Sequence, residues 1–537
     1  MKTGNNPYNI SEKYRQPAYI MLLIIITLIT FCNSFYHDFA WEDERDIINN
    51  PYIRSLSAEN LNQILFKKYD TSIYQPVSGI TTLFAYQLWE LNAMYYHIWN
   101  VVIYIINVIL IYFFILSITK NREKSFLTSL FFSVHPIHSE VVSAIFGSCY
   151  IYSFIFLMMS FLCFIKYVRS EEKKIFYYIL SIFLYFISIM TKEYGLALFP
   201  LFMLYDFTFV NELNLKNLSK RYKLYIPFIA ISIFSLYTFM NFTTRVHAVS
   251  GLSRFFHFLM DIEIFTVFYL KNLIYPYGLN PMYNIKGLYL SFLILSICVF
   301  LLIIFSLVIT WKRAKDIFYF IVWLVITLVP YTHFIVPVTY VAADRYIYVA
   351  SLSFCFFLSL IITGLYNFRE KRIYKIISLS FFILITIWYM TLTVSQNRIW
   401  KNSTVLWTYV TELDPEYKDN GLSLKFMGDT YFKSRDMENA IKYYEKSLNY
   451  NEKDGNLIFS LGIAYMAKGD YNKAVDYLGK AKKIDPSNIL IYNNLAVIYI
   501  KNGLYDKAVE EYKKSLEFDP QQEDVKENLH MLLKSEP

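Results

Sequence analysis

The chain has 537 residues, of which 56% are hydrophobic and 19% aromatic. Soluble domains are about 45–50% apolar, so this composition excludes a purely soluble protein. It predicts a polytopic membrane protein with an additional part outside the membrane. The net charge of +8 does not indicate nucleic-acid binding, because the position of the basic residues decides what they do. The five Cys residues form no CxxC pair, so neither a metal site nor a disulfide framework is expected.

The first long apolar run, residues 17–36, has no small-residue cleavage site, and more apolar runs follow. We therefore predict a retained signal-anchor helix. The next residues, 37–51, read HDFAWEDERDIINNP. Four acids lie close together in this stretch: Glu42, Asp43, Glu44 and Asp46. Acids at the end of a membrane helix must face water or a polar cavity. We expect one of them to be a catalytic base; a hydrated loop without chemistry is the alternative.

Eleven segments are long enough to cross a bilayer. They lie near residues 17–36, 97–118, 125–146, 149–167, 175–190, 194–210, 224–241, 288–310, 316–332, 345–364 and 373–394. The fold predicted for residues 1–395 is therefore an all-α polytopic bundle of about 11 spans.

Basic residues orient these spans, because cytoplasmic loops carry an excess of Lys and Arg. Basic clusters precede the first span and follow every second one, which places the N-terminus in the cytoplasm. Residues 259–275 carry Asp261, Glu263 and Lys271, and we expect an interfacial or re-entrant helix there. The acidic stretch and everything after about residue 395 then lie outside the cytoplasm, on the periplasmic side in a bacterium or in the ER lumen in a eukaryote.

Other ionisable residues collect at the outer ends of the predicted spans, where such residues usually mark a cavity or pathway. They are His97, His135, His138, Glu140, Lys192, Glu193, Asp344 and Arg345. A carboxylate that deprotonates a hydroxyl and cations that stabilise a departing phosphate are what sugar transfer from a lipid-phosphate requires. Local salt bridges are the alternative interpretation.

The composition changes after Trp400 to charged, helical sequence with an internal repeat. Three columns hold a period of 34 residues: Gly428, Gly462 and Ala496; Ala440, Ala474 and Ala508; Tyr431, Tyr465 and Tyr499. This period is the tetratricopeptide signature, which predicts a stack of helix pairs with a concave groove for peptide or protein. We expect a joining half-repeat at 396–420, then three repeats and a capping helix in 421–537.

Four longer stretches carry a resemblance over nearly the whole chain. They are FAWEDERDIINNP (39–51), YQPVSGITTLFAYQLWELNAMYYHIWN (74–100), FFSVHPIHSEVVSAIFG (131–147) and TKEYGLALFPLFMLYD (191–206), supported by VAADRYIYVASLSF (341–354) and NRIWKNSTVLW (397–407). Together they resemble the transmembrane and tetratricopeptide-repeat O-mannosyltransferase family, and the HP-x-H-x-E-x-V and DRY-x-Y blocks are the most specific.

The resemblance implies a type C glycosyltransferase fold. Such enzymes move a sugar, with inversion, from a polyprenyl-phosphate carrier to a hydroxyl of an extracytoplasmic acceptor. The family's acidic pair matches Glu42 and Asp43, with Glu-Asp here where Asp-Asp is usual, and we favour Asp43 as the base. The residues matching the family's other blocks are His135, His138, Glu140, Lys192, Glu193, Asp344 and Arg345. The late block more often has Glu-Arg in the family than Asp-Arg. We expect Lys192 and Arg345 to serve the carrier phosphate.

No cofactor and no metal are expected, because the mannosyl branch of this fold is commonly metal-independent; a divalent ion at residues 43–46 is the alternative. The expected partners are the polyprenyl-phosphate-linked sugar, membrane lipid, and a protein or peptide acceptor held in the repeat groove. A non-catalytic membrane-anchored scaffold is the second hypothesis. A transporter is a third, although no inverted repeats or broken helix pairs are evident.

Overall fold

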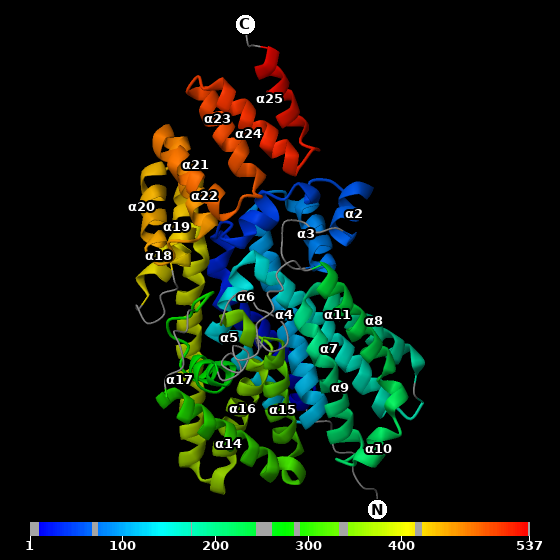
Figure 1. The fold of residues 1–537 in the computed structure, drawn as a ribbon. Helices are drawn as coiled ribbons and strands as arrows, with labels where there is room; N and C mark the ends of the chain where they lie inside the picture. Colours follow the sequence, from blue (N-terminus) through cyan, green and yellow to red (C-terminus); the bar gives the residue numbers. More distant parts are fainter. Residues whose placement is uncertain are drawn as a thin grey trace, which may run out of the picture. The chain divides into compact units, whose positions relative to one another are not determined.

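The structure is a computed structural model that describes residues 10–66, 74–172, 174–242, 260–283, 290–331, 342–413 and 421–534. The chain divides into two compact units, residues 1–402 and 403–537 (Figure 1). We call them the membrane unit and the repeat unit. In the described ranges both are built from helices, and the β structure there is an isolated bridge between Tyr283 and Ala342.

The described part of the membrane unit contains the following helices, in chain order. They are α1 (Ile10–Phe31), α2 (Ala58–Phe66), α3 (Pro76–Trp89), α4 (Ala93–Thr119), α5 (Arg122–Val134), α6 (Ser139–Ser143), α7 (Ser148–Arg169), α8 (Ile175–Thr191), α9 (Phe199–Tyr205), α10 (Leu215–Ser219), α11 (Ile226–Phe242), α13 (Tyr269–Ile274), α14 (Leu290–Arg313), α15 (Lys315–Leu328), α16 (Ser351–Asn367) and α17 (Arg372–Asn397).

Among the described residues, five helical segments are long and apolar enough to cross a membrane. They are Tyr14–Tyr36, Ala93–Thr119, Ile145–Arg169, Phe292–Arg313 and Arg372–Lys401. The other predicted spans correspond to shorter or interrupted helices, so the count of about eleven crossings stays a prediction.

Two of the segments expected to be continuous are broken. The predicted span 125–146 stops at Val134, and His135 takes an extended conformation (φ −71°, ψ 127°). Its neighbour Pro136 explains the break, because the residue before a proline is disfavoured in the helical region. The predicted span 194–210 consists of a 3-10 turn (Glu193–Leu198), α9 and a π-turn (Asp206–Val210).

The core of the membrane unit surrounds α4, which packs against α1, α5 and α7. Cross-helix serine pairs join α7 to α8: the hydroxyl of Ser153 donates to the carbonyl of Ser188 (2.9 Å), and that of Ser160 to the carbonyl of Ser181 (2.7 Å). These bonds give the serine hydroxyls hydrogen-bond partners, which lipid tails cannot supply. The small serine side chains also let the two helices approach closely.

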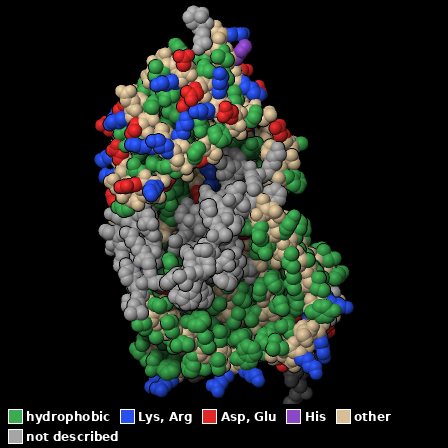
Figure 2. Space-filling model, in the orientation of Figure 1, with side chains coloured by type: hydrophobic (Ala, Val, Ile, Leu, Met, Phe, Trp, Pro, Cys, Tyr) green, Lys and Arg blue, Asp and Glu red, His purple; other side chains and the backbone are tan. Residues whose placement is uncertain are grey.

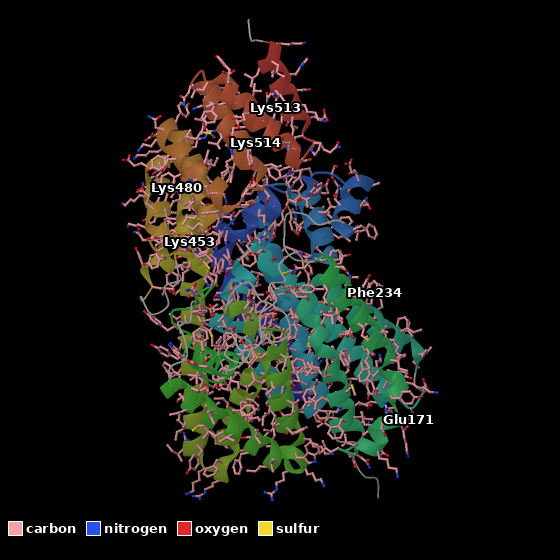
Figure 3. All side chains as sticks on the ribbon, viewed as in Figure 1. Glu171, Phe234, Lys453, Lys480, Lys513 and Lys514 are labelled. Atoms are coloured by element: carbon pink, nitrogen blue, oxygen red, sulfur yellow. The ribbon has the colours of Figure 1, made fainter. Side chains whose placement is uncertain are left out.

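Apolar side chains cover the outside of the membrane unit. Figure 2 shows a broad hydrophobic surface with Lys and Arg gathered at one edge. Phe234 of α11 points away from the bundle in Figure 3 and is 54% exposed. A surface this apolar suits lipid, because soluble monomers rarely expose contiguous apolar patches larger than a few hundred Å².

The repeat unit confirms the tetratricopeptide prediction. Its helices are α18 (Ser403–Glu412), α19 (Leu422–Lys433), α20 (Met437–Leu448), α21 (Gly455–Lys468), α22 (Tyr471–Ile484), α23 (Ile489–Lys501), α24 (Tyr505–Phe518) and α25 (Glu523–Lys534). Each pair meets at a small residue: a Cβ on Gly462 would lie 2.7 Å from the Leu478 side chain. Figure 3 labels three lysines of these helices: Lys480 in α22, and Lys513 and Lys514 in α24.

Candidate active site

The acidic loop after α1 is fixed by the carboxylate of Asp43, which is fully buried. It accepts backbone N–H bonds from Ala40 (3.1 Å), Ile145 (3.4 Å) and Phe146 (2.6 Å), so it ties its own loop to the turn before α7. Burial raises the pKa of Asp43 to about 7, against the three N–H donors, which favour the ionised form.

Two neighbours of Asp43 remain partly open to solvent. Glu42 is 26% exposed and forms an ion pair with Arg45 (3.4 Å). The same guanidinium holds Asp46 more tightly, with Nε 2.7 Å from Oδ1 and a second nitrogen 3.0 Å from Oδ2. Of Glu42 and Asp43, the two acids that match the family's acidic pair, Glu42 is therefore the one whose carboxylate a substrate can reach.

A buried ion pair joins α6 to the turn before α16. The guanidinium of Arg345 contacts one oxygen of Glu140, and the backbone N–H of Arg345 donates to the other at 2.9 Å. The guanidinium also donates to the carbonyl of Pro281 (2.9 Å) and lies 5.6 Å from the ring centre of Trp41. Trp41, on a left-handed turn (φ 54°), brings the acidic loop beside this cation.

A second cation lies at the end of α8. The ammonium of Lys192 is 2.9 Å from Glu193 and 4.9 Å from the ring centre of Tyr150. The other oxygen of Glu193 accepts from Gln75, 3.1 Å away, at the start of α3. Lys192 is thereby held as a buried cation over an aromatic face.

The structure brings most of the predicted site residues together. Lys192 is close enough to Asp46 and to Arg345 to interact with both electrostatically, and Glu42 interacts in the same way with Arg345. Three elements distant in sequence thus converge on the acidic loop.

The two predicted histidines instead form hydrogen bonds inside the bundle. His135 contacts the carbonyl of Leu273 (2.9 Å) through Nε2. His138 contacts Tyr104 (2.7 Å) through Nδ1 and Ser351 (2.8 Å) through Nε2. These contacts connect residues 135–138, which follow α5, to α4, α13 and α16. Asp344 likewise accepts from the Tyr283 hydroxyl (2.8 Å).

Sequence reasoning missed several residues of the site. Arg45 lies inside the acidic stretch, where an arginine between acids is a usable signal for an internal ion pair. Gln75 and Tyr150 carried no such signal, because their places depend on distant segments of the fold.

The arrangement suits transfer of a phosphate-linked group. One partly open carboxylate lies within electrostatic range of a buried guanidinium, and a buried ammonium interacts with the same guanidinium. A carboxylate can accept a proton from a hydroxyl, and buried cations stabilise negative charge on a leaving phosphate. Within the described residues, no group of three or more His, Cys, Asp or Glu side chains is placed to hold a metal ion.

Comparison with known sequences gives two kinds of match. Tetratricopeptide-repeat family models match residues 426–454 and 465–529. The Homo sapiens protein O-mannosyl-transferase TMTC3 is 22% identical over 479 residues, covering 81% of this chain and 52% of that protein. The Caenorhabditis elegans protein O-mannosyl-transferase F38B6.6 is 25% identical over 202 residues, covering 35% of this chain and 28% of that protein. The chain spans about half the length of the first of these curated relatives.

Two solved structures also align. An Archaeoglobus fulgidus oligosaccharyltransferase tethered to an acceptor peptide aligns with a TM-score of 0.43 at 11% identity, over 78% of this chain and 59% of that one. The Arabidopsis OM64 TPR domain aligns with a TM-score of 0.21 at 19% identity, over 22% of this chain and 99% of that domain.

Proposed function

Because this chain is homologous to the transmembrane and tetratricopeptide-repeat O-mannosyltransferases, we propose that it is an integral-membrane glycosyltransferase. Its donor is a polyprenyl-phosphate-linked sugar, with mannose as the first choice, and its acceptor is a hydroxyl of an extracytoplasmic protein. The observation that carries this proposal is that the acidic loop reaches the buried guanidinium of Arg345, which lies 5.6 Å from the ring centre of Trp41 and within electrostatic range of Glu42 and Lys192.

The donor is assigned from the two cations. Lys192 and Arg345 are 6% exposed each, and their electrostatic effect on a phosphate is strong where water is scarce. A lipid-linked donor also suits a site at the end of membrane helices, because its carrier stays in the bilayer while its phosphate reaches the cations.

The base is assigned from accessibility. Glu42 is partly exposed, whereas Asp43 is fully buried and both its oxygens accept backbone bonds. These contacts favour Glu42 as the general base and Asp43 as the residue that positions its loop, the reverse of the order expected from the resemblance.

The reaction is a single displacement at the anomeric carbon of the donor sugar. Glu42 takes the proton of the acceptor hydroxyl, whose oxygen forms the new bond to carbon. The bond from that carbon to the phosphate oxygen breaks, and the electron pair leaves with the lipid phosphate beside Lys192 and Arg345. Attack opposite to the leaving group inverts the configuration.

The repeat unit supplies the acceptor-binding surface in this proposal. Tetratricopeptide repeats stack into an extended concave surface that takes peptides. Holding the acceptor there raises its effective concentration at the membrane unit.

Donor choice tests the proposal. Purified full-length protein receives an acceptor protein and radiolabelled mannose, either as polyprenyl-phosphate-mannose or as a nucleotide-linked mannose. We expect label on the acceptor with the lipid-linked donor alone. Label from the nucleotide-linked donor alone would contradict the assigned donor, and no label from either, with folded protein, would favour the scaffold.

A further inference from the structure

An open groove of about 810 Å³ lies beside the acidic loop, in the membrane unit. Its walls are residues 35–39, which follow α1, and residues 87–95, which join α3 to α4. None of the site residues described above lines it, so the groove is a separate feature.

Aromatic rings form a large part of these walls. Tyr36 is 79% exposed and Tyr95 48% exposed, and both line the groove together with Trp89. Trp89 is held in place by Tyr96, whose ring centre is 5.2 Å away. Aromatic rings offer flat apolar faces to a ligand.

Polar side chains lie between the rings. Asp38, Glu90 and Asn92 line the groove and are exposed. In the described part of the chain, no hydrogen bond or ion pair uses the carboxylate of Asp38 or Glu90. Glu90 has a positive φ (φ 48°, ψ −121°), a conformation that costs free energy in a residue with a side chain.

The lining contains no Lys or Arg. A cation lies next to the lining: Lys401 interacts electrostatically with His37, and its carbonyl accepts the backbone N–H of Asp38 at 2.9 Å. Two carboxylates against this lysine leave the groove net acidic, which disfavours a lipid headgroup or the donor's own phosphate as the occupant. A neutral ligand that offers both apolar faces and hydroxyl donors fits the walls: carboxylates and amide oxygens accept from hydroxyls, and ring faces cover C–H surfaces.

We propose that this groove binds a neutral carbohydrate. Sugar rings have apolar C–H faces for Tyr36, Tyr95 and Trp89, and their hydroxyls match the acceptors Asp38 and Glu90. Residues 35–39 continue directly into the loop that carries Glu42, so a glycan already attached to the acceptor is the natural occupant. That role rests on the proposed function, whereas the binding itself does not.

Saturation-transfer NMR on the full chain in phosphatidylcholine nanodiscs tests the proposal. The probes are mannotriose and maltotriose, both uncharged. We expect saturable binding of at least one probe, weakened ~5–10-fold by Tyr95→Ala and also weakened by Glu90→Gln. Tyr222→Ala and Glu59→Gln, at exposed positions elsewhere in the membrane unit, are the matched controls and should leave binding unchanged.

Three outcomes overturn the proposal: no saturable signal from either probe with folded wild-type protein, equal loss in the control variants, or saturation by phosphoserine or an unglycosylated acceptor peptide instead of sugar. The assay is also separate from transfer. Sugar binding without sugar transfer would leave the groove assignment intact and count against the proposed activity. Sugar transfer without sugar binding would overturn the groove assignment and leave the proposed activity intact.

Discussion

The ion pair between Glu140 and Arg345 gives a prediction that separates stability from function. Both side chains are buried, 2% and 7% exposed, and Glu140 accepts from the guanidinium and from the backbone N–H of Arg345. Glu140→Gln keeps the shape but leaves the guanidinium without its counter-charge. Breaking a buried pair in this way costs about 3–5 kcal/mol, which we expect as a large fall in the midpoint of thermal unfolding in detergent.

The double variant Glu140→Leu with Arg345→Met completes the experiment. Replacing a buried pair by apolar residues is often neutral or stabilising, so this variant should regain most of the lost stability. It should still fail in sugar transfer, because it lacks the cation assigned to the donor phosphate. An unchanged midpoint in Glu140→Gln, or full transfer activity in the double variant, would refute this account of Arg345.

Three further predictions address the second cation, the buried acid and the repeats. Lys192→Gln should raise the KM for the lipid-linked donor at least tenfold while the KM for the acceptor stays constant, as initial rates would measure; an unchanged donor KM would contradict the assignment. Burial raises the pKa of Asp43 to about 7, so between about pH 4 and pH 7 the folded state keeps a proton that the unfolded state has released. The stability of wild-type protein should therefore fall as pH rises through this window. Thermal scans of Asp43→Asn should lack the pH dependence that comes from Asp43, and identical pH profiles for the two proteins would contradict the raised pKa. In the repeats, Gly462→Ala would bring a Cβ within 2.7 Å of Leu478, whereas Gly479→Ala meets nothing within 4 Å. Limited proteolysis should show faster cleavage of the repeat unit in the first variant and not in the second, at a cost of about 1–3 kcal/mol for overpacking.

The repeats were predictable because their signal is periodic. A small residue recurs every 34 positions where two helices touch, and the structure has close contacts there, as at Gly428 against Tyr444. Helix ends in the membrane unit were harder to predict. Apolar composition continues through residues 125–146, but Pro136 ends α5, since a local backbone restriction outweighs hydrophobic length.

The membership of the candidate site was predictable only in part. Glu42, Glu140, Lys192 and Arg345 attract notice because charge is rare near a membrane core, and they interact in the fold. The histidines attract notice for the same reason, yet hydrogen bonds to Leu273 and Ser351 place them in the packing of the bundle. The residue type alone identifies polar positions near the membrane core. Whether such a residue lies in the candidate site or in the packing of the bundle depends on its hydrogen-bond and ion-pair partners, which come from distant segments of the chain.

The most direct test of the central claim is the rate at which Glu42→Gln transfers radiolabelled mannose from polyprenyl-phosphate-mannose to an acceptor protein. The wild-type chain and Glu59→Gln, an exposed control in α2, are measured beside it, with folding checked by thermal unfolding. General-base catalysis contributes about 10²–10⁴-fold, so we predict a loss of that size in Glu42→Gln alone. A folded Glu42→Gln protein that transfers sugar at the wild-type rate would contradict the assignment, and loss confined to Asp43→Asn would make Asp43 the base.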